Sequence, residues 1–303
     1  MTVLWTCLPI ILPPHRSANS SFLSEYKMPI EVDSEIRIFD REEYHSLAHR
    51  VLGIAFDVHN EFGRLLDESL YKRAIALRCA AAGIVPARQE VQITVRFEGF
   101  EKQYFMDMLF AFGLMVETKT VESLTKAHWA QTLHYLMLTG MSNGLLVNLR
   151  PERVEHQFVS TTVDLAERRR CTIQDADFRP INEPSRWLRE TIASLLADWG
   201  GFLQVALYRE AIIHFLGGPE VALRKIPIWD GDQSLGVDEV CLLCDDTALA
   251  FTALTDSQAQ MRDHLLRYLG HTRLACIQWI NLNHHDIEFT TLLGCGRTMG
   301  AGR

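Results

Sequence analysis

Two carboxylates and a lysine lie close together in an otherwise apolar part of the sequence. Asp107 and Glu117 flank a turn at Phe112-Gly113, and Lys119 follows Glu117 at the next position but one. If an antiparallel hairpin forms here, Asp107 and Glu117 face each other with Cβ atoms roughly 5 Å apart. Side chains two residues apart on a strand share a face, so Lys119 joins them. Such buried charges require a cation or a network of ion pairs.

Carboxylate oxygens of this kind suit a divalent cation, either Mg²⁺ or, as an alternative, Mn²⁺. Such an ion binds a phosphate, lowers the pKa of a water and stabilises a departing oxygen. Lys119 would then orient the attacking water or stabilise the developing charge. A salt bridge on a solvated strand face is the alternative explanation of the same residues.

The elements that must position these residues follow an α/β order. Apolar residues at helical spacing predict helices, which cover about 42–61, 67–82 and 125–138. Residues with β-branched and aromatic side chains predict strands, which cover 91–97, 104–112, 114–120, 144–149 and 155–161. The sequence therefore predicts a mixed central sheet flanked by helices.

The second half of the chain repeats the pattern of the first at a nearly constant offset. The recurring positions include Leu70–Ile75 at Leu207–Ile212, Asp107 at Asp238, Tyr135 at Tyr268 and Asn148 at Asn281. We therefore predict a tandem duplication of one α/β fold. In the second copy, the positions of the chemical side chains differ: Glu68 aligns with Val205, Glu117 with Phe251, Lys119 with Ala253 and Gln131 with His264. We expect that copy to lack the chemistry of the first.

This comparison predicts four segments. Residues 1–35 are predicted to be a disordered leader, or to precede a true start at Met28, and 36–163 to form the domain that carries the motifs. Residues 164–184 are charged and predict a linker, and 185–303 are predicted to be the degenerate second copy.

Composition limits the classes of protein that this chain can form. The 303 residues are 48% hydrophobic and 22% charged, which is typical of a globular protein and excludes disorder as the main architecture. The net charge of −8 provides no overall basic surface, so nucleic acid would have to contact a local patch. The seven scattered cysteines favour a reducing compartment. No apolar run is long enough to span a membrane, and we expect a cytoplasmic protein.

The ordered series of motifs resembles a known superfamily. Asp107, then Glu117-Thr118-Lys119, then a helix with Gln131 and Tyr135, is similar to the RecB-like branch of the PD-(D/E)xK nuclease superfamily. The preceding segment, from Glu68 to Tyr71, resembles the GxxExxY family within it. The similarity covers about 36–161, and it implies tandem restriction-endonuclease-like units.

The resemblance also implies roles for individual residues. Glu68, Asp107 and Glu117 match the metal ligands of the superfamily, and Lys119 matches its catalytic lysine. The residues that match substrate-positioning groups are Gln131, Tyr135 and Tyr71, with core packing as the alternative for Tyr71.

Two hypotheses of function follow. The first is a metal-dependent nuclease that hydrolyses phosphodiester bonds of nucleic acid, with DNA favoured over RNA. The alternative is an inactive nuclease-fold module that binds nucleic acid or protein, which the acidic charge, the altered second copy and Leu65 at a family glycine position favour. A homodimer and intramolecular pairing of the two copies are both left open.

Overall fold

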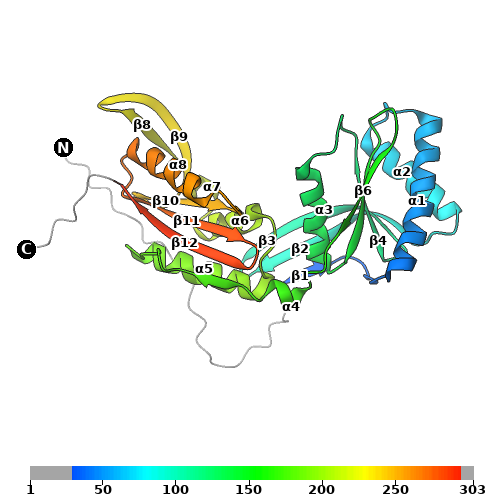
Figure 1. Cartoon of the computed structure of the whole chain (residues 1–303), viewed down its shortest axis with the longest axis horizontal. Helices are drawn as coiled ribbons and strands as arrows, with labels where there is room; N and C mark the ends of the chain where they lie inside the picture. Colours follow the sequence, from blue (N-terminus) through cyan, green and yellow to red (C-terminus); the bar gives the residue numbers. More distant parts are fainter. Residues whose placement is uncertain (1–28, 295–303) are drawn as a thin grey trace, which may run out of the picture. The chain divides into compact units, whose positions relative to one another are not determined.

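Residues 29–294 are described by the computed structural model and divide into two units (Figure 1). The first unit contains residues 29–171 together with Leu195–Gln204, and the second contains Thr172–Ser194 together with residues 205–294. Each unit has a six-stranded mixed sheet flanked by helices, which confirms the predicted fold class. Most of the predicted leader, 1–28, lies outside the described residues. Within them, no helix is long and apolar enough to cross a membrane.

The sheet of the first unit has the strand order β1-β2-β3-β4-β5-β6. β4 and β5 are parallel and are connected through α3, while the other neighbouring strands are antiparallel. The elements are β1 (Ile30–Val32), α1 (Arg41–Phe62), α2 (Glu68–Ala81), β2 (Ala87–Phe97), β3 (Phe100–Phe110), β4 (Leu114–Lys119), α3 (Lys126–Thr139), β5 (Asn143–Asn148), β6 (Glu155–Ser160) and α4 (Leu165–Arg168). All predicted elements of this unit are present. β1 lies in the segment predicted as a leader, and α4 lies in the predicted linker.

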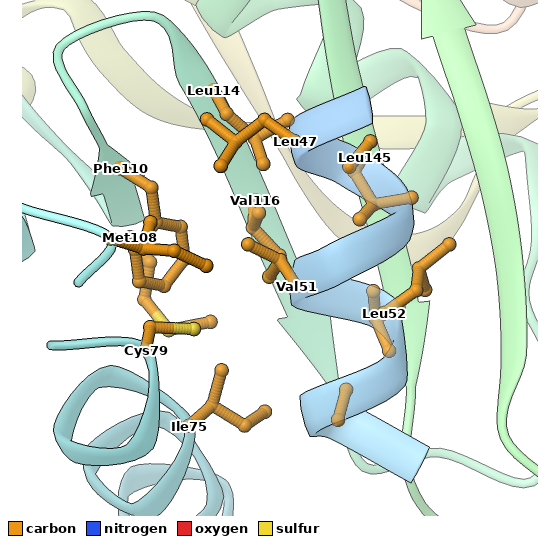
Figure 2. Close-up of a cluster of buried hydrophobic side chains, with 14 of the residues drawn as sticks. Leu47, Val51, Leu52, Ile75, Cys79, Met108, Phe110, Leu114, Val116 and Leu145 are labelled. Atoms are coloured by element: carbon orange, nitrogen blue, oxygen red, sulfur yellow. The ribbon is translucent and has the colours of Figure 1, made fainter. Parts of the chain in front are cut away.

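Helices α1 and α2 cover one face of this sheet (Figure 2). The apolar side chains that meet there come from both helices and from β3, β4 and β5: Leu47, Val51, Leu52, Ile75, Cys79, Met108, Phe110, Leu114, Val116 and Leu145. Because side chains alternate along a strand, β4 buries Val116 in this core and directs Glu117 to the opposite face. Packing of the helices against the sheet thus fixes the orientation of the strand that carries the predicted site.

The end of α5 (Glu183–Trp199) completes the first unit. Trp199 is fully buried, and its indole N–H donates a hydrogen bond to the Arg96 carbonyl at 2.8 Å. Its ring contacts those of Phe97 and Phe100, at the turn between β2 and β3, with centroid distances of 6.0 and 5.9 Å. Residues Leu195–Gln204 therefore pack in the first unit, although the sequence assigned them to the second copy.

The sheet of the second unit has the order β7-β12-β11-β10-β9-β8. The remaining elements of the described chain are β7 (Thr172–Gln174), α6 (Val205–Phe215), α7 (Pro219–Ala222), β8 (Leu223–Asp230), β9 (Gln233–Cys244), β10 (Thr247–Thr252), α8 (Gln258–Gly270), β11 (Cys276–Asn283) and β12 (Asp286–Leu293). β8 to β12 repeat the topology of β2 to β6: a hairpin, an antiparallel neighbour, a parallel strand reached through a helix, and an antiparallel last strand.

A buried asparagine makes three equivalent hydrogen bonds in both units. Asn148 at the end of β5 accepts from the Val121 amide at 3.1 Å, and its amide group donates to the Val121 carbonyl at 2.8 Å and to Glu155 at 3.1 Å. Asn281 at the end of β11 has the equivalent bonds to Leu254 at 2.7 and 2.9 Å and to Glu288 at 3.0 Å.

The partners of the two asparagines also have the same positions in the sequence. In both units, the backbone partner lies 27 residues before the asparagine and the glutamate 7 residues after it. The two units therefore share a detailed internal arrangement as well as their topology.

Replacing either asparagine should destabilise the protein. Asn148→Ala and Asn281→Ala each leave a backbone N–H, a carbonyl and a glutamate without their partner, so we expect each to lower the free energy of unfolding by about 1–3 kcal/mol. Asn283→Ala, at the half-exposed end of β11, should change it by less than about 0.5 kcal/mol. Urea unfolding followed by circular dichroism measures the three values. If Asn148→Ala lowers the free energy of unfolding and Asn281→Ala does not, the two asparagines do not have equivalent structural roles.

Candidate functional site

Three elements of the first unit bring the predicted ionisable side chains together. Glu68 is the first residue of α2, Asp107 lies on β3, and Glu117 and Lys119 lie on β4. The pairing of β3 with β4 runs from Phe110 to Met108, so the next step along the hairpin places Asp107 beside Glu117, as the sequence predicted. Burial raises the pKa of Glu68, and the charge of Asp107 raises it further while Lys119 lowers it. Glu68 is therefore close enough to the strand residues to interact electrostatically with them.

Both oxygens of the Asp107 carboxylate are engaged. Oδ2 accepts hydrogen bonds from the Thr118 amide at 2.7 Å and from the Thr118 hydroxyl at 2.9 Å. Oδ1 accepts a hydrogen bond from the ammonium group of Lys72 at 3.0 Å. Asp107 is only 7% exposed, so these contacts replace the hydration that the carboxylate has lost.

The Glu117 carboxylate is only half satisfied. Its Oε1 accepts a hydrogen bond from Lys119 at 2.8 Å, whereas Oε2 is buried and has no hydrogen-bond partner among the described residues. The Glu117 residue is 1% exposed. Burial raises the pKa of Glu117 to about 7, and the neighbouring charge of Asp107 contributes in the same direction, against the effect of Lys119. Near neutral pH, Glu117 is therefore poised between its two protonation states.

Two residues of the cluster were not anticipated from the sequence. Lys72 donates to both Asp107 and Glu90, and hydrogen bonds to these two carboxylates raise its pKa against the lowering effect of burial. Lys72 lies one helical turn after Glu68, a spacing that places both on one face of α2 and that could have indicated its position. Glu90 lies on β2 between Gln89 and Val91, which pair with Met108 and Met106 on either side of Asp107. Its backbone φ is 51°, and no sequence signal marks it.

The remaining predicted residues are divided between the site and the core. Gln131 donates to the Tyr135 hydroxyl at 3.2 Å on α3. Burial raises the pKa of Tyr135, and Glu117 is among the charges that affect it, so this pair lies near the cluster. Tyr71, in contrast, is fully buried in the core, and its hydroxyl contacts the loop before Glu68 by donating to the Gly63 carbonyl.

The donor set fits a hard divalent cation in its chemistry, because carboxylate oxygens are the preferred ligands and one of them lacks a partner. In the described residues, however, no three Asp, Glu, His or Cys side chains are grouped closely enough to hold an ion. Lys72 and Lys119 provide the positive charge in this arrangement. A metal would therefore have to bind at a cluster in which Asp107 and Glu117 are already paired with lysines.

The second unit has no such cluster at the equivalent strand positions. Lys119 pairs with Asn148, and the residue that pairs with Asn281 in the same way is Thr252, which makes Ala250 the counterpart of Glu117. The alignment predicted from the sequence, with Phe251 and Ala253, was wrong by one residue. With either alignment, the second unit has neither a carboxylate at the position of Glu117 nor a lysine at the position of Lys119.

Asp238, the predicted counterpart of Asp107, lies in an exposed part of β9. Its Oδ2 accepts a hydrogen bond from the Tyr268 hydroxyl at 2.9 Å. Asp238 thus has a different environment from the buried Asp107.

Comparison with known proteins supports a nuclease fold for the first unit. Residues 45–159 match the family model described as the PD-(D/E)XK nuclease superfamily. The match contains Glu68, Asp107, Glu117 and Lys119, and it confirms the predicted resemblance at the level of the superfamily for this region. No protein with a curated description matches the chain.

One solved structure, "Crystal structure of SSO0001", is 16% identical to the chain. The similarity covers 49% of this chain and 76% of that chain, with a TM-score of 0.25, which is too low to support any conclusion.

The raised pKa of Glu117 predicts a pH-dependent stability in metal-free buffer. The folded protein holds this proton up to a pKa of about 7, against an ordinary value of 4.5, so its stabilising effect is present at low pH and is lost as the pH rises toward 7. Glu117→Gln cannot ionise, so it does not lose stability as the pH rises. Between about pH 5 and pH 8, its unfolding free energy should therefore increase by roughly 2–3 kcal/mol relative to that of the unmodified protein.

Urea unfolding across this pH range measures the difference between the two proteins. Glu122→Gln, an exposed position of the same unit, is the matched control and should follow the unmodified protein throughout. A constant difference between Glu117→Gln and the unmodified protein would show that the Glu117 pKa is not raised.

Proposed function

We propose that the first unit is a divalent-metal-dependent nuclease that hydrolyses phosphodiester bonds. The observation that carries this proposal is the buried, unpartnered Oε2 of Glu117 beside Asp107 and Lys119, in a region that matches a nuclease superfamily. A buried charged oxygen without a partner is expensive unless it serves a ligand. Glu68 at the start of α2 supplies a further carboxylate.

In this mechanism, Glu68, Asp107 and Glu117 would hold the cation, for which Mg²⁺ is favoured and Mn²⁺ is the alternative. The bound ion would supply Lewis-acid stabilisation to a phosphate oxygen. Lys119, held against Glu117 at 2.8 Å, orients the attacking water and stabilises charge on the phosphate. The oxygen of that water forms the new bond to phosphorus while its proton passes to the surrounding water. The bond to the leaving sugar oxygen breaks, and the leaving oxygen takes up a proton from the surrounding water.

The hydrogen-bonded Gln131 and Tyr135 on α3 are proposed to position the nucleic acid, with DNA favoured over RNA. The second unit is proposed to be a degenerate copy of the first. Its shared topology and shared asparagine network support a duplication, and Ala250 and Thr252 at the key positions support a loss of catalysis.

A binding module without turnover is the second candidate. The observation that favours it is the pairing of Asp107 with Lys72 and of Glu117 with Lys119. In addition, no three side chains in the described part of the chain are grouped to hold an ion. Metal binding and cleavage distinguish the two candidates.

Substitution of the ionisable residues on β3 and β4 should strongly reduce cleavage. With Mg²⁺ or Mn²⁺ and a mixture of single- and double-stranded DNA and RNA, Glu117→Ala and Lys119→Ala should each lower the cleavage rate by about 100-fold or more, because each removes a group that acts in the transition state. Asp107→Asn should have a similar effect. Asp238→Asn is its matched control in the second unit and should leave the rate unchanged.

Calorimetric titration with the same ions measures metal binding. Circular dichroism checks that each variant is folded. Metal binding with cleavage that is lost in the variants supports the nuclease. Metal binding without cleavage of any substrate favours the binding module. If the protein binds no metal and cleaves nothing, the proposed catalytic mechanism is wrong.

A further inference from the structure

Lys72 connects two carboxylates at the centre of the cluster. Its ammonium group donates to Asp107 Oδ1 at 3.0 Å and also to Glu90. The Lys72 side chain is only 11% exposed and that of Asp107 is 10% exposed, whereas that of Glu90 is 54% exposed. Lys72 therefore bridges a buried acid and an exposed one.

The two carboxylates of the strand hairpin differ in their capacity for another ligand. Glu117 has one engaged oxygen and one without a partner among the described residues. Asp107 has no such oxygen, because Thr118 donates twice to Oδ2 and Lys72 occupies Oδ1. A divalent cation on Asp107 Oδ1 would meet the repulsion of the Lys72 ammonium at short range.

We propose that Lys72 is an internal cation that competes with the divalent metal for Asp107 and so sets the metal affinity of the site. In the metal-free protein, Lys72 neutralises Asp107. When metal binds, Lys72 leaves Asp107 and keeps its hydrogen bond to Glu90. This inference rests on the metal site of the proposed function and adds a residue that determines its affinity.

Glu90 is suited to receive the released lysine. Its neighbours Gln89 and Val91 pair with Met108 and Met106, the neighbours of Asp107 on β3. Lys72 reaches both carboxylates from α2. The Glu90 backbone φ of 51° is uncommon for a residue with a side chain, and it holds the carboxylate at this position on the strand. Because Glu90 is largely exposed, the Lys72–Glu90 pair is close to water and needs no further partner.

Calorimetric titration of the chelator-treated full chain with Mn²⁺ alone tests the competition. Lys72→Met should tighten Mn²⁺ binding by about tenfold or more, because the competing charge is gone. Lys119→Met is the matched control, since it removes a lysine from the same cluster but from a carboxylate that keeps a free oxygen. It should change the affinity clearly less. Equal tightening in both variants would indicate a general charge effect and would overturn the proposal.

The role of Glu90 is tested by a double-mutant cycle. Glu90→Gln alone should weaken Mn²⁺ binding, because Lys72 then has Asp107 as its remaining carboxylate partner in this contact. In the Lys72→Met background, the same Glu90→Gln change should have no effect on the affinity. If it weakens binding equally in both backgrounds, Glu90 contributes to the metal directly and the proposed transfer of Lys72 is wrong.

Lys72→Arg provides a test that keeps the positive charge, in case Lys72→Met does not fold. The guanidinium forms paired hydrogen bonds to carboxylates, so it should hold Asp107 more firmly and weaken Mn²⁺ binding. Unchanged or tighter binding by Lys72→Arg would contradict the proposal. If neither the unmodified protein nor any variant binds Mn²⁺, the metal site itself is wrong, whereas binding that is insensitive to position 72 refutes the competition alone.

Discussion

A carboxylate enclosed in an apolar sheet has to be neutralised, and this requirement organises the first unit. Both oxygens of Asp107 are satisfied, Oδ2 by two hydrogen bonds from Thr118 and Oδ1 by one from Lys72. Glu117 is neutralised on one side by Lys119, and its other oxygen is enclosed without a partner in the described part of the chain. A stable core would not retain such an oxygen for packing alone, because an aliphatic side chain would fill the same space without the desolvation penalty. The imbalance between these two acids therefore distinguishes this cluster from an ordinary buried ion pair.

The second unit has the same framework but no carboxylate at the strand position of Glu117. Ala250 occupies the strand position of Glu117, and Thr252 that of Lys119. The Thr252 hydroxyl donates to Asn281 at 2.8 Å and accepts from the Trp279 indole at 2.8 Å, so it contributes to local structure. The buried asparagine network is retained at the end of the neighbouring strand. The framework and the cluster of ionisable side chains are thus separable, and only the framework is common to both units.

Much of the fold could be predicted because it depends on local patterns. Helical periodicity and the turn at Phe112-Gly113 indicated α1, α2, α3 and the β3–β4 hairpin, and the hairpin in turn indicated that Asp107 and Glu117 are neighbours. The remaining features depend on contacts between distant residues. Lys72 reaches Asp107 and Glu90 across a helix–sheet contact, which no spacing on the strands reveals. In the second unit, an irregularity in the pairing of β9 with β10 near Thr247 changes the register, which a comparison of sequences does not detect.

The position of Trp199 has a consequence for how the polypeptide is made. Its indole closes over the turn between β2 and β3, but it lies 103 residues after its hydrogen-bond partner Arg96. At ribosomal rates, those residues take roughly 5 to 20 seconds to synthesise. During that time, Trp199 is not yet available to pack against Phe97 and Phe100. Apolar surface of this kind attracts chaperones and other nascent chains. Most of the first unit emerges from the ribosome before the second. Its packing is nevertheless completed only after part of the second unit, Thr172–Ser194, has been translated.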